Sequence, residues 1–135
     1  MKLIVVSLLL SLSVCGCSNQ PVQSSDEKIA NALADMQLQK SSPNERIRNY
    51  QVNSWRYVDQ YSLIIEAGFK QNYLVTLSMP CPGLMGAMSI GFTSSAGSFD
   101  KFEDIIVKAP VGRRADRCPV ADIVKLEPIP KRSAE

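Results

Sequence analysis

The side chains best placed in this sequence to do chemistry are a serine and a lysine three residues apart. Ser98 and Lys101 have this Ser-x-x-Lys spacing, and Ser25 and Lys28 repeat it nearer the start of the chain. In acyl-transfer enzymes that use such a pair, the lysine lies beside a nucleophilic serine, and Ser-Asp-Asn and Lys-Thr-Gly elements complete the site. Both of those elements are absent from this chain. We therefore interpret Ser98 as a turn residue after Gly97, with a small serine–lysine hydrolase as the alternative.

Other acid–base chemistry is narrowed by the absence of histidine from all 135 residues. Ser-His-Asp catalysis, Cys-His catalysis and histidine-bound zinc are thereby excluded. Paired carboxylates at Glu103 and Asp104, or at Asp59 and Glu66, would suit glycoside hydrolysis if both flanked one bond. Adjacent strand residues point to opposite faces, so Glu103 and Asp104 do not meet this requirement. We expect all four to be surface carboxylates, no metal or cofactor, and a chain that is not an enzyme.

The one basic cluster consists of Arg113, Arg114 and Arg117. It is a candidate ligand surface for lipopolysaccharide phosphates, peptidoglycan carboxylates or an acidic protein. Asp116 lies within the cluster and weakens its field, so the alternative is a set of solvated loop charges. The whole chain has a formal charge of only +2, which predicts no nucleic-acid partner.

A stretch rich in glycine, serine and alanine runs from Gly83 to Gly97. A phosphate-binding loop would end in Gly-Lys-Ser/Thr or lead into a helix, and neither follows. The glycines are typical of tight turns and of close backbone approach near Cys81. An exposed loop held in place there is also a sensible position for a ligand surface.

The first residues follow the order of a secretory signal, with a charged start at Lys2 and an apolar run from Leu3 to Val14. That run is shorter than the roughly 20 residues that a membrane-spanning helix needs. Its end, Val14-Cys15-Gly16-Cys17, resembles the bacterial lipobox. The resemblance implies cleavage after Gly16 and lipid attachment at Cys17. An ordinary cleaved signal with an incidental cysteine is the alternative.

The resemblance to lipoproteins also predicts a location and a division of the chain. Ser18, which follows the acceptor cysteine in place of aspartate, implies sorting to the outer membrane, with the domain facing the periplasm. We expect a lipoprotein signal peptide over 1–16, a tether over 17–25, one β-rich domain with an N-terminal helix over 26–127, and a tail over 128–135. The lipid is then the only evident membrane attachment.

The remaining cysteines, Cys81 and Cys118, are expected to form a disulfide bond. Cys15 leaves with the signal and Cys17 is acylated, and two thiols in an oxidising compartment pair readily. On the chain-entropy account, closing that loop stabilises the fold by about 4 kcal/mol. A redox site would call for a Cys-x-x-Cys spacing, which is absent.

The domain is expected to begin with an amphipathic helix. Ser24 and Glu27 fit a capping box, and an apolar stripe follows at helical spacing. We expect this helix to end near Gln39, before a Ser-Ser-Pro-Asn turn. The stripe consists of Ile29, Leu33 and Met36.

From Arg46 onward the pattern changes to strands. Alternation of apolar and polar residues and β-branched composition predict strands over 50–58, 61–66, 73–77, 89–93, 104–108 and 120–126. Two prolines around Cys81 prevent a central strand there. The fold class is therefore mainly β: a small antiparallel sheet curled into a sandwich or barrel, with one short N-terminal helix and one disulfide.

Several short motifs together resemble a family of short proteobacterial envelope lipoproteins that is known only as a domain of unknown function. The similarity covers roughly Arg46 to Leu126 and supports an anchored single domain with paired cysteines, but it brings no catalytic residues. The motifs are Arg46-Ile47-Arg48, Cys81-Pro82-Gly83-Leu84, Ile90-Gly91-Phe92-Thr93-Ser94, Phe102 to Asp104 and Cys118-Pro119-Val120.

The sequence thus predicts a lipid-anchored protein of the cell envelope, acting as a non-enzymatic binding or structural module in the periplasm. Its partners would be the membrane, through the N-terminal lipid, and an envelope protein or a cell-wall component. An inhibitor of a periplasmic or host enzyme is the alternative within the same class.

Overall fold

The computed structural model describes residues 24–48, 51–94, 97–108 and 114–131. Within these ranges the chain forms one α-helix, one short 3-10 helix and nine strands. The elements are α1 (Ser25–Asp35), β1 (Leu38–Lys40), β2 (Ile47–Arg48), β3 (Val52–Asp59), β4 (Ser62–Ala67), β5 (Gln71–Leu77), the 3-10 helix η2 (Pro82–Gly86), β6 (Ser89–Phe92), β7 (Ser98–Phe99), β8 (Asp104–Lys108) and β9 (Asp116–Pro128).

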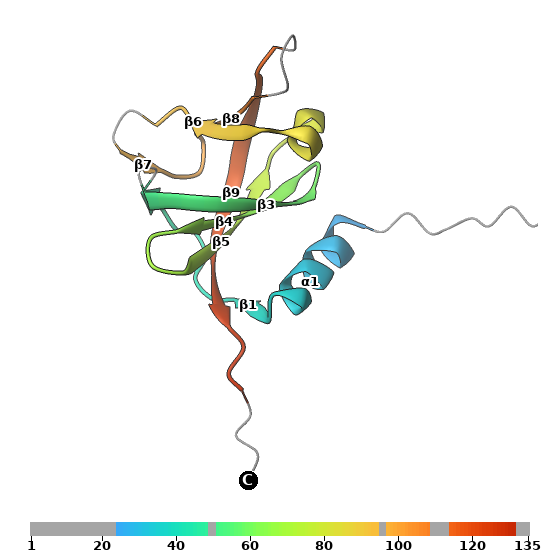
Figure 1. The fold of residues 1–135 in the computed structure, drawn as a ribbon, viewed down its shortest axis with the longest axis vertical. Coiled ribbons are helices and arrows are strands. Elements are labelled where there is room, and N and C mark those ends of the chain that lie inside the picture. Colours follow the sequence, from blue (N-terminus) through green and yellow to red (C-terminus); the bar gives the residue numbers. More distant parts are fainter. Residues whose placement is uncertain (1–23, 49–50, 95–96, 109–113, 132–135) are drawn as a thin grey trace, which may run out of the picture.

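Seven of the strands form one antiparallel sheet that curls into a half-barrel, as Figure 1 shows. The order across the sheet is β3-β4-β5-β9-β8-β6, and β1 pairs with β9. β2 and β7 form a separate two-stranded sheet. The predicted fold class, a mainly β domain with a curled antiparallel sheet, one helix and one disulfide, is confirmed.

β9 is longer than the predicted strand over 120–126, because it pairs with three partners in succession. Its first residues pair with β8, its middle with β5 and its end with β1. Pro119 does not end the strand, because its carbonyl still accepts a hydrogen bond from the Ser78 N–H at 2.9 Å. Proline removes a donor from a sheet but keeps its acceptor.

α1 begins as predicted and ends earlier. The Ser24 side chain caps its first turn by accepting a hydrogen bond from the Glu27 N–H at 3.3 Å. The helix ends at Asp35, four residues before the predicted end at Gln39, because Gln37 takes a left-handed backbone conformation with φ 54°. The residues after Gln37 then pair with β9 instead of continuing the helix.

The small β2–β7 sheet was not predicted, and it corrects the prediction for Ser98. Ser98 lies in β7 opposite Arg48, rather than in a turn after Gly97. The neighbouring pair in this sheet, Ile47 and Phe99, is fully buried in the main core. The ring of Phe99 lies 4.6 Å from that of Phe92, centroid to centroid. These contacts hold two very short strands in place.

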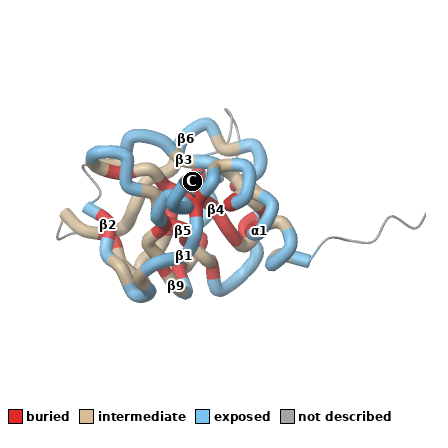
Figure 2. Tube along the Cα trace, turned by 90° about the horizontal axis from the view of Figure 1, so that it is seen from below, coloured by how far each residue is buried: buried red, intermediate tan, exposed pale blue. Residues whose placement is uncertain are grey.

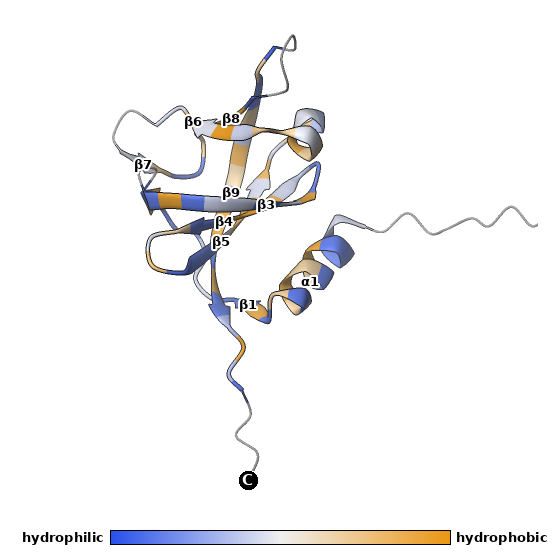
Figure 3. Cartoon of the chain, in the orientation of Figure 1, coloured by the Kyte–Doolittle hydropathy of each residue, from blue (hydrophilic) through white to orange (hydrophobic). Residues whose placement is uncertain are grey.

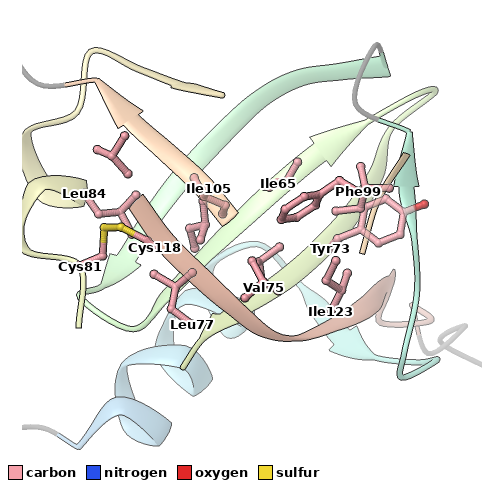
Figure 4. Packing of buried hydrophobic residues seen from close by; sticks show 14 of the residues in the cluster. Ile65, Tyr73, Val75, Leu77, Cys81, Leu84, Phe99, Ile105, Cys118 and Ile123 are labelled. Carbon is pink, nitrogen blue, oxygen red and sulfur yellow. A yellow bond between two sulfur atoms is a disulfide. The ribbon is translucent and has the colours of Figure 1, made fainter. Parts of the chain in front are cut away.

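The main core fills the inner face of the half-barrel. Figure 4 shows it stretching from the disulfide and Leu84 at one end to Tyr73 and Phe99 at the other. The predicted disulfide between Cys81 and Cys118 is confirmed, with a Cα–Cα distance of 5.8 Å. The disulfide ties the segment after β5 to the start of β9. Figure 2 shows that buried residues concentrate in the strands at the centre of the sheet.

A second, smaller core lies on the outer face of the sheet, between the sheet and α1. Alternation along β4 divides the two cores, since Leu63 and Ile65 point into the main core and Ile64 points toward α1. Figure 3 shows that α1 carries both hydrophobic and hydrophilic residues. The buried members of this second core are Ile29, Leu33, Leu38, Ile64, Leu74 and Leu126.

Candidate functional site

A cavity of about 380 Å³ lies beside α1 on the outer face of the sheet. We call it the α1 cavity. Its walls come from the start of α1, from the end of β1, from the β3–β4 turn and from β4, β5 and β9. It is lined by Ser25, Asp26, Ile29, Lys40, Tyr61, Ser62, Leu74, Thr76, Leu77, Asp122 and Val124.

A row of three polar side chains crosses one end of the α1 cavity. Ser62 on β4 pairs with Thr76 on β5, and Thr76 pairs in turn with Asp122 on β9. Residues directly opposite one another in neighbouring strands project to the same face of a sheet. Two hydroxyls and one carboxylate therefore lie side by side, one from each of three adjacent strands.

A β-bulge places Asp122 in this row. Thr76 pairs with Asp122 but the next residue, Leu77, pairs with Val120, so Ala121 has no partner in β5. An extra residue in one strand shifts the alternation of its side chains by one position. Val120 and Ile123 can therefore both enter the main core, while Asp122 between them faces the α1 cavity.

Ser62 is the unusual member of the row. It is only 1% exposed, and its hydroxyl has no hydrogen-bond partner within the part of the chain that the structure describes. Buried polar groups in proteins are almost always hydrogen-bonded, and an unpaired one costs about 1–3 kcal/mol. The oxygen itself has almost no accessible surface, so a bound molecule can satisfy it once the Ser62 side chain turns toward the cavity.

The charged groups of the α1 cavity have a negative balance. Asp122 and Asp26 each contribute a carboxylate, and Lys40 contributes the single ammonium among the lining residues. One oxygen of Asp122, Oδ1, accepts a hydrogen bond from the Ile123 N–H at 2.9 Å. Asp26 and Lys40 are exposed at the rim, while Asp122 is half-buried.

The comparisons with known proteins identify a family. The profile of a family of unknown function (DUF6491) matches residues 1–135. The chain belongs to this family. DUF6491 therefore covers more of the chain than the predicted similarity from Arg46 to Leu126, and the predicted relation to a family of unknown function is confirmed. Neither the curated proteins nor the solved structures contain a match to this DUF6491 chain.

The Ser-x-x-Lys pair of this DUF6491 member is occupied with other contacts. The Lys101 ammonium donates a hydrogen bond to the Asn44 side chain at 2.8 Å and lies 5.5 Å from the centre of the Phe102 ring. The carbonyl of Ser98 accepts a hydrogen bond from the Ser94 hydroxyl. The described contacts of the Lys101 ammonium are therefore with Asn44 and Phe102, and they do not support activation of a serine by this lysine.

The second pair, Ser25 and Lys28, lies in the first turns of α1. Ser25 lines the α1 cavity, whereas Lys28 lines a different hollow on the helix. The two side chains are therefore assigned to separate surfaces.

The four carboxylates considered for glycoside hydrolysis do not form a pair. Glu103 accepts a hydrogen bond from the Asp100 N–H at 3.0 Å, and Asp104 forms a 3.5 Å ion pair with Arg117. Asp59 is buried, contrary to the expectation of a surface position, because it closes the β3–β4 turn by accepting from the Tyr61 N–H at 2.8 Å.

Glu66 lies at the far end of the same hairpin from Asp59. Asp59 pairs with Ser62 at the start of β4, and Glu66 lies four residues further along that strand. At about 3.3 Å per residue, the two positions are about 13 Å apart along β4. That separation is larger than either mechanism of glycoside hydrolysis uses.

The predicted basic surface is divided by an ion pair. Arg117 engages Asp104, and Arg114 is exposed. Arg113 lies outside the described residues, as does the proposed lipid-bearing Cys17. Of the two arginines of this cluster that the structure describes, Arg117 forms an ion pair and Arg114 forms none.

The glycine-rich stretch begins as a 3-10 helix held against β9. At Gly83 a Cβ would meet the carboxylate of Asp116, so a side chain fits there only if that carboxylate moves aside. Gly97 has a positive φ of 74°, which glycine adopts readily. The close approach predicted near Cys81 is thus seen at Gly83, while the tight turn predicted for the glycines of this stretch stays a prediction.

Two methionines make the same stretch apolar on its outside. Met85 is 73% exposed and Met88 is 74% exposed. Both lie close in sequence to Cys81, so the disulfide fixes the segment that carries them.

Two further hollows flank α1. One of about 430 Å³ lies between the outer side of the helix and β3, and one of about 260 Å³ lies near the end of the helix, at Met36. In the first, burial raises the pKa of the Tyr57 phenol above its ordinary value of 10.0, and the Asp59 carboxylate adds to this. Because neither hollow contains an unpaired buried polar group among the described residues, the α1 cavity is the stronger candidate.

Sequence reasoning missed the α1 cavity. Ser62 and Thr76 stand out locally as polar residues within apolar strands, next to Leu63 and Val75. Their pairing and the bulge that adds Asp122 depend on strand register, which local sequence does not reveal. Among the described residues, the structure contains no helix long and apolar enough to cross a membrane.

Proposed function

We propose that this protein is a lipid-anchored component of the bacterial cell envelope, held in the outer membrane with its domain facing the periplasm. We further propose that the domain is a non-enzymatic binding module that takes a small ligand in the α1 cavity. The run Val14-Cys15-Gly16-Cys17, with its resemblance to a lipobox, supports the anchor. The disulfide between Cys81 and Cys118 supports export, because such bonds persist in oxidising compartments.

The unpaired hydroxyl of Ser62 carries the proposal of a ligand. It is buried, its residue is among those that line a cavity of about 380 Å³, and Thr76 opposite it in β5 can also form hydrogen bonds. Ligand sites in proteins combine an apolar lining with a few polar groups that fix orientation. The α1 cavity has this composition, with Leu74 and Val124 beside Ser62.

Several observations support a non-enzymatic role. The sequence has no histidine, so imidazole acid–base catalysis is excluded. The Lys101 ammonium is bonded to Asn44, and Asp59 and Glu66 lie at opposite ends of one hairpin. Labelling of the purified protein with a fluorophosphonate or an acylating β-lactam tests the rival hydrolase. Modification at Ser98 that disappears in Ser98→Ala would contradict the proposal.

The anchor is tested by substitution of the two cysteines near the start of the chain. Cys17→Ala should release the protein from membranes, because lipid chains at that sulfur would be the attachment. Cys15→Ala is the matched control and should leave the protein in the membrane fraction. Sedimentation of Cys17→Ala with membranes to the same extent as the unmodified chain would refute the anchor.

The cavity is tested by NMR titration of the full chain in nonionic detergent with a panel of short-chain alcohols, carboxylates and amines. Binding should move the amide signals of residues that line the α1 cavity. Val124→Trp should abolish binding by filling the cavity, while Ser54→Trp, on the same face of the sheet but outside it, should not. If no compound shifts these signals, the proposed binding function is wrong.

A further inference from the structure

We infer that the α1 cavity recognises an alkylammonium group, that is, a primary amine carried on a short aliphatic chain. This inference rests on the proposed binding function and names the chemical class of its ligand. Three features of the cavity support it: the charge of its lining, the polar row and the aliphatic floor.

The charge of the lining favours a cation. Asp122 is the half-buried acidic member of the polar row, and Asp26 lies at the rim, so two carboxylates are among the lining residues. Lys40 is exposed, and its ammonium can extend into solvent at little cost. Oδ1 of Asp122 is bonded to the Ile123 N–H, and Oδ2 remains to accept from a ligand.

The polar row suits the three donors of an ammonium. Neighbouring strands lie about 4.8 Å apart, so a nitrogen above Thr76 has Ser62 on one side and Asp122 on the other. An ammonium has three N–H groups and no acceptor. One can bond the carboxylate of Asp122 and another the hydroxyl of Thr76 in the adjacent strand, and the hydrogen of that hydroxyl can then turn to the oxygen of Ser62. This arrangement would satisfy the unpaired hydroxyl of Ser62.

The start of α1 combines the positive end of a helix dipole with a carboxylate. A helix N-terminus attracts anions through unpaired N–H groups. Of these groups in α1, the Glu27 N–H bonds the Ser24 hydroxyl at 3.3 Å, which leaves fewer donors for an anion. Asp26 in the same turn adds a negative charge next to the cavity. A carboxylate ligand would be repelled by Asp26 and Asp122, and among the charged lining residues only the exposed Lys40 would attract it.

The floor of the cavity specifies the rest of the ligand. Ile29, Leu74, Leu77 and Val124 provide branched aliphatic surface, and Tyr61 is the one aromatic residue among the lining residues. Such a floor gains free energy by covering methylene groups, about 0.8 kcal/mol for each one removed from water. A short alkyl chain with the amine at its end therefore matches both parts of the site.

Three probes of equal chain length test the inference: hexylamine, hexanol and hexanoate, each titrated at pH 7 into the full chain in nonionic detergent. We expect hexylammonium to bind most tightly, with NMR shifts at the α1 cavity. Asp122→Asn should weaken its binding about tenfold or more, because a hydrogen bond to a charged group is lost. The amide keeps an oxygen that can still accept from the Ile123 N–H.

Two control variants separate local from general charge effects. Asp35→Asn removes one negative charge from the exposed end of the same helix, outside the α1 cavity, and should leave the affinity for hexylammonium unchanged. Lys40→Gln removes the competing cation and should strengthen binding of hexylammonium while it weakens binding of hexanoate.

The outcomes distinguish this inference from the proposed function on which it rests. If hexanol or hexanoate binds in the α1 cavity as tightly as hexylammonium, the inference is overturned and the cavity remains a binding site. Equal effects of Asp122→Asn and Asp35→Asn would likewise overturn it. If none of the three probes shifts a cavity residue, the inference and the binding function both fail.

Discussion

Removal of the Ser62 hydroxyl should stabilise the free protein, which is the opposite of what a buried serine normally predicts. In Ser62→Ala the strand, its register and the methylene of the side chain are kept, and only an oxygen without a hydrogen-bond partner is lost. A buried hydroxyl left unpaired costs about 1–3 kcal/mol of desolvation. The small void left by the oxygen offsets part of this gain. We expect the free energy of unfolding to rise by about 1 kcal/mol.

The single tryptophan makes this change measurable. Trp55 is partly buried against the main core, so its fluorescence should report unfolding in urea. Thr93→Val is the matched control, since the Thr93 hydroxyl accepts from the Asp104 N–H at 3.0 Å. Loss of that bonded hydroxyl should lower the free energy of unfolding by about 1 kcal/mol.

The two variants therefore shift stability in opposite directions if the reasoning holds. A loss of 1 kcal/mol or more in Ser62→Ala would show that its hydroxyl is paired in the free protein, and the case for a ligand there would collapse. If Ser62→Ala is more stable but binds hexylammonium more weakly, the Ser62 hydroxyl destabilises the free protein and contributes to ligand binding. Such a trade between stability and function is common at ligand sites.

Three further results are expected. Cys81→Ala with Cys118→Ala should lower the free energy of unfolding by about 4 kcal/mol in urea titrations, since the bond closes a 37-residue separation; a reductant should then have no further effect. Gly83→Ala should lower the free energy of unfolding in urea by less than about 1 kcal/mol, because the exposed Asp116 carboxylate can move aside. A larger decrease would mean that the backbone itself has to move. Burial, and secondarily the Glu45 carboxylate, raises the pKa of Tyr73 above 10.0, so stability present below pH 10 should fall as the pH rises beyond it. Tyr73→Phe should flatten that alkaline loss in denaturation experiments at pH 9 to 12, and an unchanged slope would contradict the assignment.

Local pattern was sufficient to predict the strands that make the main core. β4, β5 and β8 lie within a residue or two of the segments at 61–66, 73–77 and 104–108, because each contains a short apolar run rich in β-branched or aromatic side chains. The helix start at Ser24 was also predictable, since a capping residue acts on its own turn.

Features that depend on distant partners could not be predicted in this way. β2 and β7 are two residues long and exist because Ile47 and Phe99 are buried together, although 52 positions separate them in the chain. The end of α1 was missed because the pairing of Leu38 with Pro128 competes with continuation of the helix. The candidate site combines both difficulties, since its polar row requires the register of three strands and a bulge at Ala121.

The position of β9 in the chain constrains when the domain can fold during its synthesis. β9 is the hydrogen-bonding neighbour of β1, β5 and β8, and it contributes one cysteine of the disulfide. Until the ribosome has released residues 116–128, the β3–β4–β5 and β6–β8 segments have no strand to join them. A nascent chain stopped before residue 116 should therefore stay open and protease-sensitive, and such late folding would be compatible with the proposed export.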